Sequence, residues 1–282
     1  MLVTSRKTEL QSILHDARNK NHTIGLVPTM GALHSGHLTL VKRAVSENDV
    51  VVVSIFINPT QFDNQEDLEK YPRDFDGDAA LLKSISEHII IFAPTKEEIY
   101  NGDVKSDTYH FDGLEKVMEG TFRKGHFEGV ATIVELLFKA VAPDRAYFGE
   151  KDFQQLQIIK KLVASKNIPL EIVPCPIERE ENGLAMSSRN ERLPKSTREQ
   201  AGFIYHALKT AKNKFGTESA NDIAVWVENV FDKNKLFELE YFEIADVHTL
   251  TPITKRKKNQ KYRAFIAVYA DDIRLIDNIA LN

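Results

Sequence analysis

Two histidines, His34 and His37, lie three residues apart in the segment Val27-Pro28-Thr29-Met30-Gly31-Ala32-Leu33-His34-Ser35-Gly36-His37. The run from Thr23 to Pro28 is apolar and typical of a buried parallel strand, and apolar residues recur at helical spacing after His37. We therefore predict a turn that joins a strand to a helix beginning near Ser35 or Gly36. The first amides of a helix have no intrahelical partner, so this turn is suited to bind phosphate oxygens.

Two other interpretations of the histidines stay open at this point. Zinc would need a third and usually a fourth ligand, and the single cysteine, Cys175, lies far along the chain. The histidines can also be structural residues with no chemistry. Gly31 and Gly36 favour the phosphate interpretation because glycine lets the backbone approach a ligand closely.

Two further segments combine groups that bind phosphate. In Gly149-Glu150-Lys151-Asp152, at a strand end, Lys151 offers a point charge and Asp152 an acceptor for ribose hydroxyls. In Met186-Ser187-Ser188-Arg189, the guanidinium can grip two phosphate oxygens while the hydroxyls donate further bonds. Each has an ordinary alternative, since Asp152 is a sensible helix N-cap and Ser-Ser-Arg is common in surface loops.

Neutral amides occur close to these segments. Asn58 and Gln61 lie in a proline turn after an apolar strand, and Gln155 falls one turn into the helix after Lys151. Amides near a nucleotide site suggest a small polar substrate that is recognised by hydrogen bonds. Any one of them alone is more often structural.

Carboxylates follow the segment Tyr71-Pro72-Arg73. Among them, Asp76 and Asp78 are candidates to hold hydrated magnesium, although acidic residues in a first turn also favour a helix start. Further along, Met118 to Gly129 carries three glycines and several charges, including Arg123 and His126. We expect this segment to be a mobile loop that covers a site.

Strand-like and helical patterns alternate through the first part of the chain, which predicts a parallel sheet with its ligands beyond the carboxyl ends of the strands. The predicted strands are Ile24 to Pro28, Val50 to Ile57, Ile89 to Phe92, Ala146 to Phe148 and Leu170 to Val173. The predicted helices are Gly36 to Ser46, Asp74 to Ser86, Val130 to Val141 and Phe153 to Lys166.

The pattern changes after Pro174-Cys175-Pro176 to helices and then strands. Helices are predicted at Pro194 to Phe215 and Ala220 to Phe231, and strands at Leu239 to Val247, Tyr262 to Tyr269 and Ile273 to Ile276. We expect an α/β protein in which residues 1–175 form a Rossmann-like parallel-sheet domain. Residues 176–282 are expected to form a smaller α+β lid domain.

Composition limits the function classes. The chain has 282 residues, 42% of them hydrophobic and 28% charged, as in an ordinary globular protein. A net charge of -4 gives no global attraction to nucleic acid or to an anionic membrane. The basic run Lys255-Arg256-Lys257-Lys258 holds no aromatic residue and is interpreted as a solvated hairpin turn. With one cysteine, no signal region and no long apolar run, we expect a complete cytosolic protein.

Taken together, the segments resemble the pantoate-β-alanine ligases of the nucleotidyltransferase superfamily with the His-x-Gly-His signature. The resemblance rests on PTMGALHSGH, FINPTQF, YPR, GHFEGV, GEKDFQQ and the serine-serine-arginine turn, in the family's order and across essentially the whole chain. His-x-Gly-His alone would specify only the superfamily. The methionine before the two serines occupies a position at which family members vary.

The resemblance implies a reaction that condenses (R)-pantoate with β-alanine, with ATP and Mg²⁺, in vitamin B5 and coenzyme A biosynthesis. Pantoate attacks the α-phosphorus of ATP to give pantoyl adenylate and pyrophosphate, and β-alanine then displaces AMP. The resemblance also implies a cytoplasmic homodimer. The β-rich run Val50 to Phe56 either serves an interface or is core.

By the same resemblance, the residues that meet ATP are Met30, Gly31, Ala32, Leu33, His34, Ser35, Gly36, His37, Gly149, Glu150, Lys151, Asp152, Glu178, Met186, Ser187, Ser188 and Arg189. His34, His37, Lys151 and Arg189 are the expected catalytic residues among them. Gln61 and Gln155 are expected to hold pantoate, with Asn58 close by. Arg123 and His126 are expected to approach the triphosphate when their loop closes.

The sizes of two electrostatic energies predict whether the histidines are protonated when ATP is bound. A helix start opposes an imidazolium by ~0.3 to 1 kcal/mol, whereas a phosphate charge at ~4 Å favours it by ~4 kcal/mol at an effective dielectric near 20. We therefore expect His34 and His37 to act as donors to the triphosphate once ATP is bound, with His37 the better candidate acid.

Two rival functions remain at this stage. A coenzyme adenylyltransferase would place cations at the acceptor pocket, where this chain offers Asn58, Gln61 and Gln155. A nucleotide-binding regulatory or RNA-binding module would bind ATP without releasing pyrophosphate, and it would leave the amides unexplained.

Overall fold

The computed structural model describes residues 1–62, 64–253 and 255–282. The chain divides into two compact units. The N-terminal unit comprises Met1–Glu115, Glu119–Glu150 and Gln155–Pro176, and the C-terminal unit comprises Lys116–Met118, Lys151–Gln154 and Ile177–Asn282. Within these described ranges, no helix combines the length and apolar character needed to cross a membrane.

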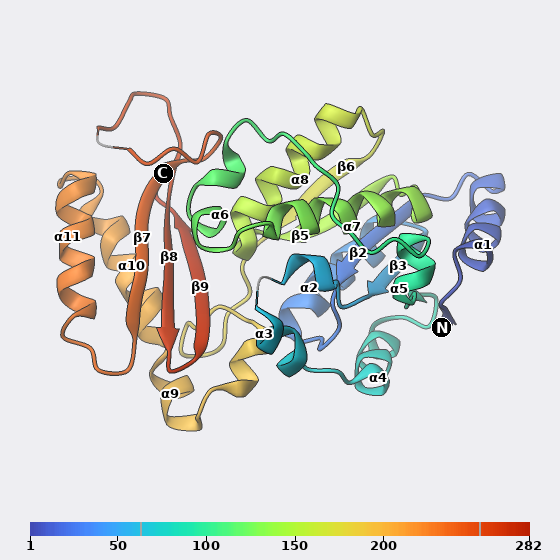
Figure 1. Cartoon of the computed structure of the whole chain (residues 1–282), viewed down its shortest axis with the longest axis horizontal. Coiled ribbons are helices and arrows are strands. Elements are labelled where there is room, and N and C mark those ends of the chain that lie inside the picture. The colour runs from blue at the N-terminus through green and yellow to red at the C-terminus, as the bar shows by residue number, and fades with distance from the viewer. Residues whose placement is uncertain (63, 254) are drawn as a thin grey trace. The chain divides into compact units, whose positions relative to one another are not determined.

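The N-terminal unit is built on a six-stranded parallel sheet (Figure 1). Its strands are β1 (Leu2–Thr4), β2 (Ile24–Thr29), β3 (Val50–Ile55), β4 (Ile90–Phe92), β5 (Arg145–Gly149) and β6 (Glu171–Cys175). They lie in the order β1-β4-β3-β2-β5-β6, and the parallel sheet predicted from the sequence is confirmed. The order reverses between β2 and β5, so the crevice that open α/β sheets use for ligands is expected beyond their carboxyl ends.

Helices cover both faces of this sheet. They are α1 (Lys7–Asn19), α2 (Ser35–Glu47), α3 (Gln65–Lys70), α4 (Phe75–Ile85), α5 (Lys96–Tyr100), α6 (Glu119–Phe122), α7 (His126–Val141) and α8 (Phe153–Lys166), with short 3₁₀ turns η1 (Pro59–Gln61), η2 (Leu114–Lys116) and η3 (Glu150–Asp152). On one face α2 packs against α4, while α7 contacts α1 from the other (Figure 1). The strands lie between these two layers of helices. Apolar side chains of β2, β3 and β5 are therefore buried, as is typical of a parallel sheet that is covered on both faces.

Burial and secondary structure test two of the sequence expectations. Val51, Val52 and Val53 are fully buried in the middle of the sheet, so the β-rich run is core. The segment from Met118 to Gly129, expected as a mobile loop, instead contains α6 and the first turn of α7. The expectation of a loop was wrong because Met118 and Phe127 are buried, and this burial outweighs the local glycines.

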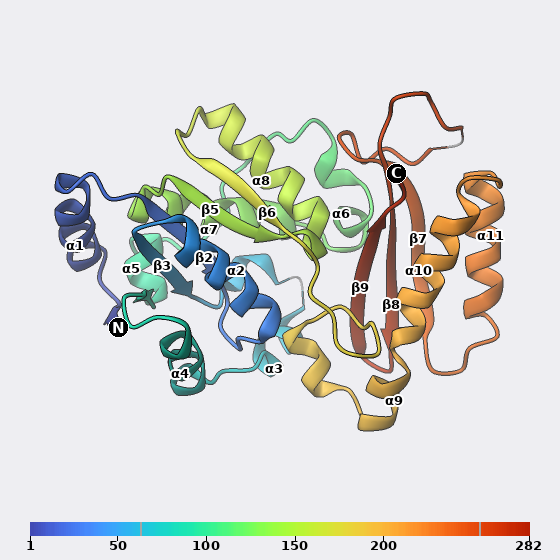
Figure 2. The ribbon, with the colours of Figure 1, turned by 180° about the vertical axis from the view of Figure 1, so that it is seen from behind.

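The C-terminal unit is a three-stranded antiparallel sheet with helices on one face (Figure 2). The strands are β7 (Glu238–Asp246), β8 (Tyr262–Ala270) and β9 (Ile273–Ala280), and the helices are α9 (Lys195–Gln200), α10 (Gly202–Lys214) and α11 (Ala220–Phe231), preceded by η4 (Ser188–Arg192). Side chains of α10 and α11 form one apolar core with alternate residues of the strands. The basic residues Lys255 to Lys258 are exposed between β7 and β8, as a solvated turn requires.

Gly129 of α7 is a point of close backbone approach in the N-terminal unit. A Cβ at this position would lie 2.3 Å from the carbonyl oxygen of Thr60 and 2.7 Å from the amide nitrogen of Gln61. Both contacts are with backbone atoms, which cannot turn aside as a flexible side chain would. The absence of a side chain at Gly129 therefore allows η1 to pack directly on α7.

We expect Gly129→Ala to lower the free energy of unfolding. Overpacking costs about 1–3 kcal/mol, and the better helix propensity of alanine returns at most about 1 kcal/mol. Gly216→Ala is the control, because a Cβ there meets nothing within 4 Å. Urea unfolding of both variants measures the difference. A Gly129→Ala protein as stable as wild type would show that η1 is not held against α7 in solution.

Candidate active site

The turn after β2 has an unusual backbone. Gly31 and Ala32 are consecutive residues in the left-handed region, with φ values of +81° and +50°. Glycine is suited to the first position, where a Cβ would lie only 3.0 Å from a carboxylate oxygen of Asp78. The second position is filled by alanine, which adopts this conformation at a cost. The turn therefore depends on contacts that stabilise it from outside.

Asp78 supplies those contacts from α4. Its Oδ2 accepts the amide of Ala32 at 2.9 Å and its Oδ1 accepts the amide of Leu33 at 2.6 Å. Asp78 is only 3% exposed, and its burial raises the pKa of the carboxyl while the two amide bonds oppose that shift. The amide of Gly31 donates to Thr29 Oγ1 at 3.2 Å. Three amides that the sequence suggested for phosphate are therefore used within the protein.

The histidines follow directly at the start of α2. His34 is the N-cap residue, and its amide donates to Nδ1 of His37 at 3.4 Å. The two rings lie side by side, with centroids 4.1 Å apart. Because Nδ1 of His37 accepts a bond, the proton of the neutral ring is assigned to Nε2. His37 is thereby prepared as a donor through Nε2, the ring nitrogen away from the backbone.

The carboxylates of α4 do not offer a metal site. Both oxygens of Asp78 are directed at backbone amides, and Asp76 is exposed in the first turn of the helix. Among the residues that the structure describes, no group of three or more histidine, cysteine, aspartate or glutamate side chains is arranged to hold a metal ion. These residues do not fit a protein-bound magnesium ion, which prefers several carboxylate, phosphate or water oxygens.

Asn58 and Gln61 form a hydrogen-bonded pair that we call the amide cluster, and Asn58 is its centre. Its side chain is 1% exposed, and its Nδ2 donates to the carbonyl oxygen of Gly129 at 3.1 Å and to Oε1 of Gln61 at 3.2 Å. Its Oδ1 accepts bonds from the hydroxyls of Tyr100 and Thr60, at 2.5 and 3.1 Å. Sequence reasoning missed Tyr100, since nothing local links a tyrosine in α5 to a proline turn 40 residues earlier. Burial raises the pKa of Tyr100, which keeps its hydroxyl a donor.

Gln61 connects this cluster to the histidine turn. Its Nε2 lies 2.8 Å from the sulfur of Met30, the residue that follows β2. The main-chain carbonyl oxygen of Gln61 is hydrogen-bonded to Nδ1 of His126 at 2.7 Å. The structure therefore brings the proline turn and the histidine turn together at the carboxyl ends of β3 and β2, as the parallel sheet predicts.

His126 contacts both Arg123 and the main chain of Gln61. His126 is 6% exposed, and its Nε2 is 3.1 Å from Nη1 of Arg123, which also pairs with Glu119 at 3.6 Å. His126 thus supports the backbone that carries Gln61. Gln155 is half-buried in the first turn of α8 and is not part of this described network. Gly149 ends β5, and Glu150 begins η3 directly after it.

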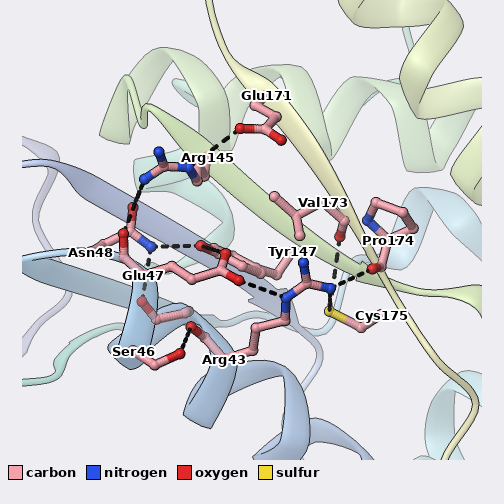
Figure 3. Close-up of polar contacts among 11 residues, drawn as sticks. Arg43, Ser46, Glu47, Asn48, Arg145, Tyr147, Glu171, Val173, Pro174 and Cys175 are labelled. Atoms are coloured by element: carbon pink, nitrogen blue, oxygen red, sulfur yellow. Dashed lines mark hydrogen bonds and ion pairs between the residues drawn. The ribbon is translucent and has the colours of Figure 1, made fainter.

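A polar network holds the far end of α2 onto the sheet (Figure 3). Arg43 donates to the carbonyl oxygen of Pro174 at 2.8 Å and to Glu47 at 2.9 Å. Glu47 in turn accepts the hydroxyl of Tyr147 at 2.9 Å. Burial raises the pKa of Tyr147 to about 12, and Arg43 holds the pKa of Glu47 below its usual range. The network joins α2 to β5 and β6, which fixes the direction of the helix whose first turn carries the histidines.

The remaining candidates lie in the C-terminal unit. Lys151 has its Nζ 3.8 Å from Asp152, and its carbonyl oxygen accepts a bond from Asn278 at 2.8 Å. The amide of Met186 donates to the carbonyl oxygen of Glu178 at 2.9 Å, so the segment from Glu178 to Met186 turns back on itself. It leads into η4, where Ser187 Oγ accepts the amide of Arg189 at 3.3 Å. Ser188, the next residue, is buried.

Comparison with known proteins gives a consistent result. Residues 2–280 match the family model for pantoate-beta-alanine ligase. The pantothenate synthetase of Christiangramia forsetii is 55% identical over 282 residues, which cover 100% of both chains. The crystal structure of pantothenate synthetase from Thermus thermophilus has a TM-score of 0.91 at 39% identity, over 100% of this chain and 99% of that one.

A second structure carries ligands. It is a pantoate-beta-alanine ligase from Francisella tularensis in complex with beta-gamma ATP and beta-alanine, with a TM-score of 0.80 and 35% identity over 100% of this chain and 98% of that one. The family model and the relatives span the whole chain, including the histidine turn, the amide cluster and both sheets. This chain therefore belongs to the pantoate-beta-alanine ligase family.

Proposed function

We propose that this chain joins (R)-pantoate to β-alanine at the histidine turn and the Asn58–Gln61 segment, in the two-step reaction of its family. The observation that carries the proposal is the contact between Gln61 and Met30, which places an amide for a small polar substrate beside a turn with two imidazoles. The Francisella relative crystallised with beta-gamma ATP and beta-alanine supports the same pair of ligands.

In the first step a carboxylate oxygen of pantoate attacks the α-phosphorus of ATP. A new oxygen–phosphorus bond forms, and the bond to the bridging oxygen of pyrophosphate breaks. Negative charge grows on the departing pyrophosphate, so donors aimed at the triphosphate accelerate the reaction more than donors aimed at pantoate. Nε2 of His37 is the donor best prepared for this, since the amide of His34 already occupies Nδ1. His34 is the second donor.

In the second step the amine of β-alanine attacks the acyl carbon of pantoyl adenylate, and AMP departs. The amide bond forms as the acyl–phosphate bond breaks, and the neutral amine loses one of its two protons and keeps the other as the amide N–H. The acyl adenylate is a reactive mixed anhydride of a carboxylic acid and a phosphate, so holding the amine close to it supplies most of the required acceleration. Gln61, Gln155 and the neighbouring Asn58 are proposed to hold pantoate in place for both attacks.

Residues of both units are proposed to supply the remaining contacts with ATP. Lys151, Ser187, Ser188 and Arg189 are assigned to the phosphates, Gly149 and Asp152 to the ribose, and the backbone at Glu178 to adenine. Arg123 and His126 are proposed to approach the triphosphate on closure. Magnesium is proposed to be carried by the phosphate oxygens of ATP, because Asp78 is committed to the turn. We also propose that the protein is cytoplasmic and forms a homodimer, and light scattering tests the dimer.

The reaction itself is tested by leaving out one substrate at a time. With ATP, magnesium, pantoate and β-alanine, we expect equal amounts of pantothenate, AMP and pyrophosphate. Without β-alanine, a single turnover of pyrophosphate is expected, and without pantoate none. Pyrophosphate release that needs no pantoate would point to another acceptor, and ATP binding with no release at all would leave only a regulatory module.

Substitution of His37 tests the donor role. His37→Ala is expected to slow single-turnover formation of pantoyl adenylate by about 10²- to 10³-fold, the usual cost of one such donor. His37→Gln keeps an N–H near the position of Nε2 and should recover part of the rate. Adenylate formation at the wild-type rate in His37→Ala would end the proposal that this ring stabilises the transition state.

Substitution of Asp78 tests the support of the turn. Asp78→Asn keeps the shape but offers only one acceptor, and it turns an N–H toward a backbone N–H. We expect a folded protein whose adenylation rate falls by about 10²-fold, because small displacements of catalytic groups have effects of this size. Asp76→Asn, an exposed change in the same helix turn, is expected to react within twofold of wild type. Losses of equal size in both would favour a shared magnesium site.

A further inference from the structure

The main chain of Lys151 is held by a buried side chain of β9. Nδ2 of Asn278 donates to the carbonyl oxygen of Lys151 at 2.8 Å, and Asn278 is only 2% exposed. Lys151 follows β5 in the sequence, yet Lys151–Gln154 is grouped with the C-terminal unit. The Asn278 bond ties this short segment to the antiparallel sheet.

Arg263 of β8 fixes the orientation of the Asn278 amide. It donates to Oδ1 of Asn278, and a guanidinium has only donors, so the oxygen must face Arg263 and the nitrogen must face Lys151. The same guanidinium lies over the ring of Phe153, 4.1 Å from its centroid. Phe153 also contacts Phe265 of β8. Residues 151–153 are therefore attached to the sheet at two points that share one buried arginine.

Asp277, the residue before Asn278, anchors a second segment that is proposed to bind ATP. Asp277 accepts two bonds from Arg179, at 2.6 and 2.9 Å, and Arg179 also donates to the carbonyl oxygen of Gly183 at 3.0 Å. Arg179 follows Glu178 directly, so this ion pair fixes the segment that leads to Met186 and η4. Adjacent residues of a strand point to opposite faces of the sheet. Two neighbouring positions of β9 thus anchor two segments proposed to bind ATP.

We propose that Asn278 is a positioning residue for Lys151 in the adenylation step, a role that rests on the function proposed above. Asn278 contacts the backbone of Lys151 and fixes the point from which its side chain extends. Without the bond, the carbonyl of Lys151 loses a buried donor and the segment shifts. A shift of about 1 Å in a catalytic group lowers rates by up to 10²-fold.

Asn278→Asp is the sharpest substitution. It keeps the size of the side chain and gives Arg263 a charged partner, which favours a folded protein. It removes the N–H, however, and sets a carboxylate oxygen against the carbonyl oxygen of Lys151. We expect single-turnover adenylate formation to fall 10- to 100-fold. Asn278→Ala, which removes the same donor without adding charge, is expected to show a loss of the same order and carries the test if the aspartate variant does not fold.

Asn282, an exposed residue of the same unit, provides a control for the chemical change itself. Its Nδ2 donates to the carbonyl oxygen of Gln260 and its Oδ1 accepts the amide of Tyr262, each at 2.8 Å. Asn282→Asp therefore makes the same chemical change in a similar bonding pattern, away from Lys151. It is expected to form adenylate within twofold of the wild-type rate. A loss in Asn282→Asp as large as that in Asn278→Asp would overturn the proposal, because the effect would not be specific to the Lys151 segment.

A double-substitution cycle with Lys151→Ala separates positioning from general destabilisation. If Asn278 acts through Lys151, Asn278→Asp should slow the wild-type protein but leave the Lys151→Ala protein within twofold of its own rate. Equal slowing in both backgrounds would overturn the proposal, and so would a wild-type rate in Asn278→Asp when Lys151→Ala is slow. A wild-type rate in Lys151→Ala itself would instead remove the proposed role of Lys151, and this inference with it.

Discussion

The buried carboxylate of Asp78 is the constraint on which the N-terminal site depends. A carboxylate that is removed from water costs several kcal/mol unless its oxygens are bonded, and here both oxygens accept backbone amides. In return, two consecutive left-handed residues, Gly31 and Ala32, are held in a conformation that an isolated chain would rarely adopt. Because α2 begins directly after this turn, the positions of His34 and His37 follow from the same contact.

Other buried hydrogen bonds of the N-terminal unit hold the elements around this turn in place. The network of Arg43, Glu47 and Tyr147 fixes the other end of α2, and Asn58 joins the amide cluster to α7 and α5. Polar groups that are buried and fully bonded favour one arrangement, because any displacement leaves a donor or acceptor unsatisfied. The C-terminal unit uses the same device in Asn278 and Asp277. Each unit thus carries its own buried anchor beneath the groups proposed to meet ATP.

Much of the fold was accessible from patterns along the chain. The five strands predicted for the parallel sheet and the strands of the second sheet all occur, since their period and their flanking turns are local properties. The errors fall where tertiary burial overrides local composition. The segment around Met118 reads as a loop because of its glycines, but its apolar residues pack into the core. Asp78 reads as a candidate metal ligand, but the fold places it against the amides of Ala32 and Leu33.

The sequence by itself determined the family, most of the longer strands and helices, and the types of residue available to bind a triphosphate and a small polar substrate; it missed the short strand β1 and the helices α1, α3, α5 and α6. The features that it did determine depend on motifs and periodicities that are local properties of the sequence. Only the tertiary structure decided which amides of the histidine turn are already used, which nitrogen of His37 accepts the amide of His34, and that Tyr100 supports Asn58. The physical reason is that hydrogen bonds between residues tens of positions apart, such as Asn58 with Gly129 or Asn278 with Lys151, leave no local signal in the chain.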